Sequence, residues 1–338
     1  MSDDIQTRAE LYRMMVRIRA FEDAAEAASQ GGVSAYGKAA DGRAKVRGPL
    51  HLSTGQEAVP AGVCAHLRSC DYLTSTHRGH GHTLAKGADL RRMMGELFGK
   101  ATGFNGGKGG SMHIADFSIG MLGANGVVAA GMPIAVGAAH AQKLLRRDGI
   151  TACFFGDGAI NRGPFLESLN WARVFDLPVL FVCEDNRWSA TTASGPMTGG
   201  DGAAARALSL GIPAAQVDGN DVMAVHALAA PLVQQVRSGG GPRFLHALTY
   251  RVKGHVSVDL AAYRDPLELQ AALETDPIAR ARAQYLALPG TDARTLEAIE
   301  REALTEVSAA LVEADAAAWP DAASAFTDVQ TTGAGQWH

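Results

Sequence analysis

Apolar and polar positions follow two different rhythms along the chain. Near the amino terminus, apolar residues recur at the spacing of a helix: Leu11, Met14, Met15, Ile18, Phe21 and Ala25. This spacing predicts an amphipathic helix within residues 1–30, and Thr7 with Glu10 has the spacing of a capping box. Residues 31–50 mix glycine with charge and have no periodicity, so we expect a mobile surface loop there.

The middle of the chain alternates helical patterns with short, continuously apolar runs. The predicted elements are helices at 133–147 and 163–175 and strands at 151–155, 177–183 and 243–252. Such strands between amphipathic helices are typical of a mostly parallel sheet with helices on both faces. We therefore expect an α/β domain over residues 51–273. From Pro266 onward, Ala, Glu and Arg at helical spacing predict a C-terminal helical region and tail over residues 274–338.

Composition and charge narrow the class of partner. The net charge is only -4 over 338 residues, with no long basic run, which argues against binding to nucleic acid or an anionic membrane. No apolar stretch reaches the roughly 18 residues of a membrane helix, and the first residues do not resemble a signal peptide. The cysteines form no CxxC pair: Cys64, Cys70, Cys153 and Cys183. We expect a cytoplasmic protein that binds a small molecule or another protein.

The segment FFGDGAINRG, residues 154–163, is the sharpest chemical feature, because it stands where a predicted strand ends and a helix begins. Ligands of open α/β sheets bind at strand carboxyl ends, where glycines let backbone amides approach a phosphate. Asp157 and Asn186, each after a predicted strand, should meet at one edge of the sheet and suit Mg²⁺ beside phosphates. A glycine-flanked aspartate alone is more often an ordinary turn. No GxGxxG follows a strand, so a nicotinamide site lacks its phosphate loop.

A resemblance to a known family rests on a longer series of motifs. They occur in this order: HLSTGQEA, THRGHGHTLAKG, GKGGSMHIAD, GMLGANGVV, FFGDGAINRG, LPVLFVCEDN and GHVSVDLAAYRDP. From about Leu11 to Leu273, the chain resembles the alpha subunit of the thiamin-diphosphate-dependent first component of 2-oxo-acid and acetoin dehydrogenase complexes. THRGHGH and GMLGANGVV are most similar to acetoin dehydrogenases. The implied fold is the α/β thiamin-diphosphate-binding fold with N- and C-terminal helical additions.

The resemblance also implies an activity and partners. The cofactors would be thiamin diphosphate and Mg²⁺, and the reaction would be acetoin cleavage, or decarboxylation of pyruvate or another 2-oxo acid. The acyl group would pass to a lipoyl acyltransferase component. The glutamate that activates the cofactor comes from a beta subunit in such enzymes, so we expect an α₂β₂ heterotetramer. Glu57 is the only tempting substitute, but its motif matches a different segment of the family.

Cofactor and metal ligands follow from the same resemblance. It implies that Asp157, the Asn186 side chain and the Trp188 carbonyl bind Mg²⁺. The residues implied to contact the cofactor are His77, Arg78, Gly126, Val128, Gly156, Asp157, Gly158, Ala159, Asn186, Trp188 and His255. Arg78 would grip the diphosphate with its fixed positive fork. Its alternative role is a surface ion pair, and Val128 could be an ordinary buried valine.

Histidines complete the implied site. His51 and His255 match the catalytic histidines, which can donate a proton or hydrogen-bond an intermediate, although either could be structural. His77 stands where many relatives have tyrosine. His80 and His113 are expected to organise neighbouring groups and not to carry protons.

Two positions depart from the family pattern. Arg162 replaces a usual glutamine, which leaves its contact with a phosphate open. Val256 replaces a serine that mammalian relatives phosphorylate, so kinase control is not expected.

Two other functions are alternatives to that of a dehydrogenase alpha subunit. One is half of a split transketolase-like enzyme, which lacks support from HLSTGQEA and GGSMHIAD. Another is a scaffolding subunit without turnover, which the intact Asp157 and Asn186 argue against.

Overall fold

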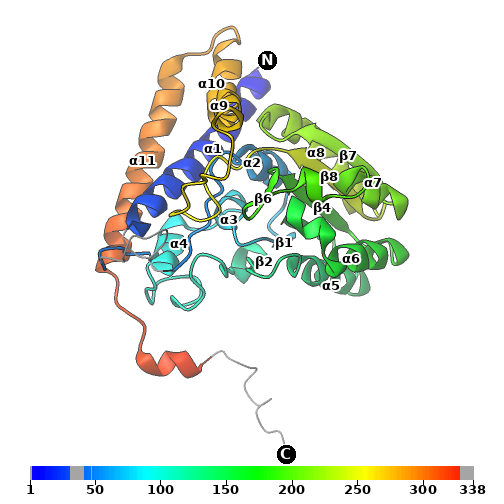
Figure 1. Ribbon diagram of the computed structural model, residues 1–338, viewed down its shortest axis with the longest axis horizontal. Coiled ribbons are helices and arrows are strands. Elements are labelled where there is room, and N and C mark those ends of the chain that lie inside the picture. The colour runs from blue at the N-terminus through cyan, green and yellow to red at the C-terminus, as the bar shows by residue number, and fades with distance from the viewer. Residues whose placement is uncertain (1, 31–41, 47, 328–338) are drawn as a thin grey trace, which may run out of the picture.

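A parallel sheet forms the centre of the molecule. The computed structural model describes residues 2–30, 42–46 and 48–327 (Figure 1). Its main sheet consists of β1 (Tyr72–Thr74), β2 (Met121–Gly123), β3 (Thr151–Gly156), β4 (Val179–Asp185), β7 (Ala214–Asp218) and β8 (Arg243–Leu248). The strand order is β2-β1-β3-β4-β8-β7, and every neighbouring pair is parallel. In the register of β3 and β4, Gly156 lies opposite Glu184, so the segments that follow both strands begin at the same edge.

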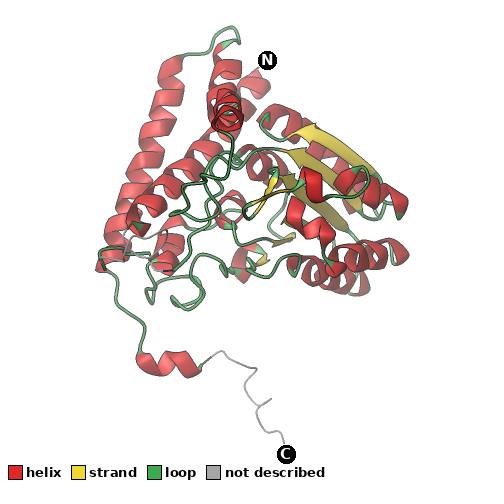
Figure 2. Ribbon diagram, in the orientation of Figure 1, coloured by secondary structure: helices red, strands yellow, loops and turns green. Residues whose placement is uncertain are grey.

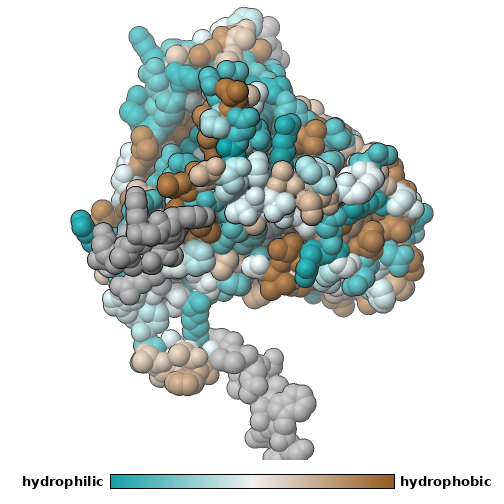
Figure 3. Space-filling model, in the orientation of Figure 1, coloured by the Kyte–Doolittle hydropathy of each residue, from teal (hydrophilic) through white to brown (hydrophobic). Residues whose placement is uncertain are grey.

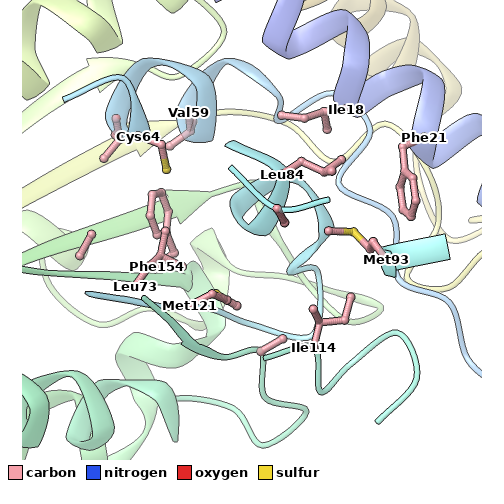
Figure 4. Close-up of a cluster of buried hydrophobic side chains, with 14 of the residues drawn as sticks. Ile18, Phe21, Val59, Cys64, Leu73, Leu84, Met93, Ile114, Met121 and Phe154 are labelled. Carbon is pink, nitrogen blue, oxygen red and sulfur yellow. The ribbon is translucent and has the colours of Figure 1, made fainter. Parts of the chain in front are cut away.

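Helices cover both faces of this sheet (Figure 2). One face carries α2 (Ala58–Cys64), α3 (His80–Ala85), α4 (Leu90–Leu97) and α8 (Val222–Arg237). The other carries α5 (Gly131–Leu144), α6 (Gly163–Val174) and α7 (Gly202–Ser209). The close-up in Figure 4 shows the first core, in which Phe154 of β3 and Leu73 of β1 lie beneath Val59 and Cys64 of α2. Strands buried on both faces explain the continuously apolar sequence of β3 and β4.

Long helices form a second layer beside the sheet. The helix α1 (Ser2–Ser29) packs against α11 (Ala293–Ala316), with α10 (Pro277–Leu286) and α9 (Pro266–Glu274) nearby (Figure 1). Polar contacts also join α1 to α11, because Arg17 pairs with Glu306 and the Tyr12 hydroxyl donates to Glu300. The N-terminal helix α1 and the C-terminal helix α11 are therefore held together on the side of the first core.

Short elements complete the described chain. They are the strands β5 (Trp188–Ser189) and β6 (Thr192–Ala193) and the 3₁₀ turns η1 (Phe117–Ile119), η2 (Asp157–Asn161), η3 (Gly195–Met197) and η4 (Ala322–Phe326). The β5–β6 hairpin and η2 follow directly after β4 and β3, so they build the carboxyl edge of the sheet. Within the described residues, no helix is both long and apolar enough to span a membrane.

Most predicted elements are confirmed, with three corrections. The capping box is wrong, because α1 already begins at Ser2 and Glu10 instead accepts from Gln6 within the helix. The predicted strand 243–252 ends at Leu248. The proposed surface loop lies largely outside the described residues, but Val46 near its end is buried in the first core. The domain boundaries at residues 51 and 273 stay a prediction.

Candidate active site

A cavity opens at the carboxyl ends of β3 and β4. It encloses about 990 Å³ of space, counted out to its open mouth. Every residue to which the sequence assigned a cofactor, metal or catalytic role lines it: His51, His77, Arg78, Gly126, Val128, Gly156, Asp157, Gly158, Ala159, Asn186, Trp188 and His255. The structure thus gathers residues that lie up to 204 positions apart in the sequence around one space, whereas the roles of the individual residues stay predictions.

Asp157 provides a buried carboxylate at the floor of this cavity. Gly156 ends β3 in an extended conformation and Asp157 opens the turn η2. The side chain is only 4% exposed, and its Oδ2 atom has no hydrogen-bond partner. Burial raises the pKa of this carboxyl to about 6, although Ser194 opposes the shift by hydrogen bonding. A buried oxygen without a partner is costly unless a cation or a donor satisfies it.

Asn186 and Trp188 reach the cavity from the end of β4. Arg187 between them adopts a left-handed conformation with φ 68°, which turns the chain back toward Asp157. The Asn186 side chain accepts a bond from the Trp188 amide and donates to Gln56. The Trp188 carbonyl accepts a long bond of 3.4 Å from Arg251. A Cβ atom on Gly158 would collide with the Ser189 side chain, so only glycine lets η2 pack this closely on the hairpin.

Two arginine side chains bring buried positive charge to the same cavity. Arg78 is 5% exposed and Arg251 only 1%. The Arg78 guanidinium donates to the Leu52 and His255 carbonyls, and Arg251 donates to the Ala190 carbonyl at 2.8 Å. Among the described residues, no carboxylate forms an ion pair with either guanidinium. Burial lowers the pKa of Arg78 to about 9 and that of Arg251 to about 10, so both positions favour an anionic ligand.

Three histidines stand against each other on the cavity wall. The ring centroids of His51 lie 4.6 Å from His77 and 4.8 Å from His255. Burial, followed by the charge of Arg78, lowers the pKa of His51 to about 3 and of His255 to about 4. The same causes hold the pKa of His77 far below its ordinary value. All three rings are therefore neutral at physiological pH.

Two hydrogen-bonded groups of side chains, each made of a carboxylate, a histidine and a serine, lie next to the cavity. In one, His80 bridges Glu22 at 2.9 Å and Ser111 at 3.0 Å, which is the organising position expected for His80. In the other, His82 bridges Glu184 at 3.0 Å and Ser75 at 2.7 Å. Helix α3 supplies both histidines, so it ties the N-terminal helix and the sheet edge to the loops of the cavity.

Other candidates lie away from the cavity lining. His113 is exposed and does not line the cavity; its ring hydrogen-bonds the Gly109 carbonyl of its own loop and lies beside Gly126. Arg162 is also exposed and does not line the cavity, so its suggested phosphate contact has no support. Glu57 is fully buried against Arg19 and is not available for cofactor activation.

Sequence reasoning missed several side chains of the cavity. Glu184 carried a signal, because a charged residue directly after the predicted strand 177–183 stands at the ligand-binding edge of the sheet. Arg251 lay inside the predicted strand 243–252, and only the observed end of β8 at Leu248 places it beyond the strand. Gln56, which orients Asn186 at 2.9 Å, lies on another segment and could not be paired with it by local pattern.

The family follows from a match that covers most of the chain. The family model described as "Dehydrogenase E1 component" matches residues 35–323, a range that includes all the cavity residues named above. The chain belongs to this family.

Individual relatives agree with this assignment. The alpha subunit of acetoin:2,6-dichlorophenolindophenol oxidoreductase from Bacillus subtilis is 42% identical, covering 94% of this chain and 92% of the relative. The protein of the same name from Cupriavidus necator is 40% identical over 96% and 95% of the two chains. The pyruvate dehydrogenase E1 component subunit alpha of Rhizobium meliloti is 36% identical over 94% and 88%. This chain is therefore similar over nearly its whole length to alpha subunits.

Proposed function

We propose that this cavity binds thiamin diphosphate with Mg²⁺, and that the chain is the alpha subunit of an acetoin dehydrogenase first component. One observation carries the proposal: a buried carboxylate oxygen without a partner, on Asp157, shares the cavity with two buried guanidiniums that lack carboxylates. A cation fits the buried carboxylate, and an anion fits the two guanidiniums. A metal diphosphate satisfies both at once.

Different residues of the chain would bind the metal and the diphosphate. Asp157, the Asn186 amide oxygen and the Trp188 carbonyl are the oxygen donors for Mg²⁺. Arg78 holds the diphosphate, with backbone groups of Gly158 and Ala159 at the start of the turn η2. Binding of this anion would also offset the charge that the two buried arginines share, because an oppositely charged partner compensates for lost hydration.

When bound, thiamin diphosphate supplies a thiazolium ring that accepts the electron pair of the broken carbon–carbon bond. The chain's part is to position, protonate and exclude water. Gly126 and Val128 also line the cavity, and we assign them to the aminopyrimidine on the strength of the family resemblance. His51 and His255 are the assigned proton-handling residues, because each presents an imidazole to the cavity.

A beta subunit is part of this proposal, as an alpha subunit of the family implies. Val127 and Val128 line the cavity yet are 64% and 46% exposed, so the cavity is incomplete on that side. Further apolar side chains are exposed on α5 and α6 or one residue after them: Ile134, Leu144, Leu145, Leu166, Trp171, Val174 and Phe175. Figure 3 shows hydrophobic surface in the part of the molecule where these two helices lie. Exposed apolar surface of this kind is typical of subunit interfaces. We infer an α₂β₂ heterotetramer in which the beta subunit closes the cavity and provides the activating glutamate.

The substrate assignment follows the relatives' names. Two relatives of 42% and 40% identity over at least 94% of this chain act on acetoin by name, which favours acetoin as substrate and transfer of the acyl group to a lipoyl acyltransferase. The alternative substrate is pyruvate, because a relative named as a pyruvate dehydrogenase alpha subunit is 41% identical over 72% of this chain, and others are 36% identical over at least 92% of it.

The test is to reconstitute the enzyme. We would co-express the chain with its beta subunit and measure dye reduction with acetoin and with pyruvate, in the presence of Mg²⁺ and thiamin diphosphate. The expected result is acetoin-dependent reduction by the pair and none by the isolated chain. Activity of the isolated chain, or of the pair without the cofactor, would contradict the proposal.

A further inference from the structure

One side chain provides the buried anchor of the β5–β6 hairpin. Between residues 187 and 193, every side chain is exposed or half-buried except that of Trp188, which is 9% exposed. The carbonyl of the same residue is a proposed metal ligand. The bond that it accepts from Arg251 is 3.4 Å long and contributes little to its orientation. The direction of this carbonyl therefore depends on how firmly the Trp188 side chain is held.

Three side chains from residues 263–268 surround the Trp188 indole. Its N–H group donates to the Glu268 carboxylate of α9 at 3.1 Å. The Arg264 guanidinium lies 5.2 Å from the centre of the indole ring, and the centre of the Tyr263 ring lies 5.4 Å from it. These distances are typical of a cation–π contact and of paired aromatic rings. We refer to Tyr263, Arg264 and Glu268 as the indole clamp.

Aromatic rings compensate the buried charge of Arg264. This side chain is 6% exposed, and its Nε and Nη2 atoms are buried without a hydrogen-bond partner. Its Nη1 atom donates to the Arg251 carbonyl at 2.5 Å. No carboxylate of the described residues forms an ion pair with it, but the rings of Trp188, Tyr250 and Tyr263 lie 5.2 to 5.8 Å away. Because the ring faces offset the charge, displacement of the indole would also destabilise Arg264.

An open space lies beside the indole clamp. A second cavity encloses about 1040 Å³ at the carboxyl ends of β7 and β8, and its lining includes Arg187, Tyr250 and Glu268. The Tyr250 hydroxyl is buried there without a hydrogen-bond partner. Close packing therefore does not confine the indole on the side of Glu268. The hydrogen bond and the cation–π contact have to hold it in place.

We propose that Glu268 and Arg264 are positioning residues, which hold the Trp188 indole and so keep the Trp188 carbonyl directed at the bound metal. This inference rests on the proposed function, because it requires a metal beside Asp157. Mg²⁺ needs near-octahedral ligand geometry at about 2.0–2.1 Å, whereas Ca²⁺ accepts variable geometry at longer distances. A loosened carbonyl should therefore weaken binding of Mg²⁺ more than binding of Ca²⁺.

The test measures the affinity of the assembled complex for thiamin diphosphate by calorimetry, once with Mg²⁺ and once with Ca²⁺. Glu268→Ala removes the acceptor of the indole N–H bond, and Trp188→Phe removes the donor but keeps the backbone carbonyl. Each should weaken binding with Mg²⁺ by about 5–30-fold, and binding with Ca²⁺ by less. Glu268→Gln keeps an acceptor oxygen and should retain most of the affinity. Glu274→Ala is the matched control, at an exposed glutamate of the same helix.

Two further variants test the link between these residues. Glu268→Ala combined with Trp188→Phe should bind no more weakly than the weaker of the two single variants, because both changes remove one and the same hydrogen bond. Arg264→Met removes the charge and keeps a long side chain, and it should lower the preference for Mg²⁺ over Ca²⁺ in the same direction.

The possible outcomes separate this inference from the proposed function. Single variants that bind the cofactor like the wild type with Mg²⁺, or that lose affinity equally with both metals, would overturn the inference but leave the proposed function standing. Additive losses in the double variant would also overturn it, since Glu268 would then act independently of Trp188. A wild-type complex that binds thiamin diphosphate equally with and without a metal would overturn the proposed function, and the inference with it.

Discussion

Two buried carboxylates in this molecule have opposite surroundings. Glu96, at the end of α4, accepts four backbone N–H bonds, from Asn105, Gly107, Gly109 and Gly110, at 2.8 to 3.0 Å. Asp157, at the end of β3, keeps one oxygen buried without a partner. A glycine-rich loop wraps around Glu96 and supplies its hydrogen-bond donors. The free oxygen of Asp157 needs a partner from outside the chain. Burial alone therefore does not distinguish structural from functional acids, but hydrogen-bond satisfaction does.

The loop around Glu96 needs glycine for a local reason. Gly107 has a φ of 78°, and a Cβ atom there would collide with the backbone of Gly99. The same loop continues to Ser111, which His80 holds, and to Met112, which lines the cavity. Glu96, whose oxygens are fully hydrogen-bonded, thus helps to shape the cavity that contains Asp157.

Replacement of Asp157 should have the largest effect on function. In the assembled complex, Asp157→Ala should weaken Mg²⁺-dependent cofactor binding by at least about 10³-fold, or roughly 4 kcal/mol, because it removes the only full negative charge among the proposed metal ligands. Calorimetry measures this affinity. Asp148→Ala is the matched control, since that aspartate forms an exposed pair with Arg68 and should bind normally. Unchanged affinity in Asp157→Ala would move the metal site elsewhere.

His255 should matter for turnover more than for binding. His255→Ala should lower kcat by about 10²–10⁴-fold, whereas cofactor affinity should fall less than in Asp157→Ala because the metal ligands and Arg78 remain. Steady-state kinetics of the complex at saturating cofactor check this, with His66→Ala as control. Near-normal turnover would leave His255 with a structural role only.

Glu96 should behave in the opposite way, as a stability residue. Glu96→Gln replaces one acceptor oxygen by an N–H donor that faces two backbone N–H groups, so the free energy of unfolding should fall by about 2–4 kcal/mol. Thermal or denaturant unfolding of the isolated chain measures this, and Glu313→Gln is the control at an exposed pair with Arg91. If Glu96→Gln left stability unchanged while Asp157→Asn lowered it, the comparison between the two acids would be wrong.

A pH dependence of stability tests the surroundings of Asp157, with a smaller expected effect. Because the pKa of Asp157 is raised to about 6 in the folded chain, the folded state binds this proton more tightly than the unfolded state. The stabilisation is complete below the ordinary pKa of aspartate, near 4, and is lost as the pH rises to about 6. Asp157→Asn should therefore stabilise the chain without metal above pH 6, by roughly 1–3 kcal/mol.

Metal binding has the complementary dependence on pH. A proton competes with Mg²⁺ for the same carboxylate, so Mg²⁺ affinity should fall about tenfold per pH unit below 6 and level off above it. Calorimetry at several pH values, with and without Mg²⁺, gives both results. A Mg²⁺ affinity that is constant from pH 5 to 7 would contradict the assignment of Asp157.

The sequence predicted which residues line the cavity better than it predicted the periphery of the molecule. Asp157 and Asn186 were found because both follow apolar strands, and parallel strands end at one edge. The local sequence pattern could not predict that Arg251 contacts Trp188, because this contact depends on where the segment after β8 folds back. Short elements such as β1 and α3 were missed because three to six residues are too few for a periodicity to show.

The N-terminal capping box failed for a different reason. Thr7 and Glu10 fit the pattern, but the helix continues past them because Asp4 pairs with Arg8 and Gln6 with Glu10 within it. Side-chain pairs four residues apart are as compatible with a helix interior as with its start. The spacing therefore could not fix where the helix begins.

The central claim is that the cavity binds a metal diphosphate which this chain holds and a beta subunit completes. Calorimetric titration of thiamin diphosphate into the assembled complex, with Mg²⁺ and then with a chelator, tests it most directly. We predict tight binding with Mg²⁺, a loss of affinity of at least about 10²-fold with the chelator, and weak binding to the isolated chain. Equal affinity with and without the metal, or full affinity in the isolated chain, would contradict the account.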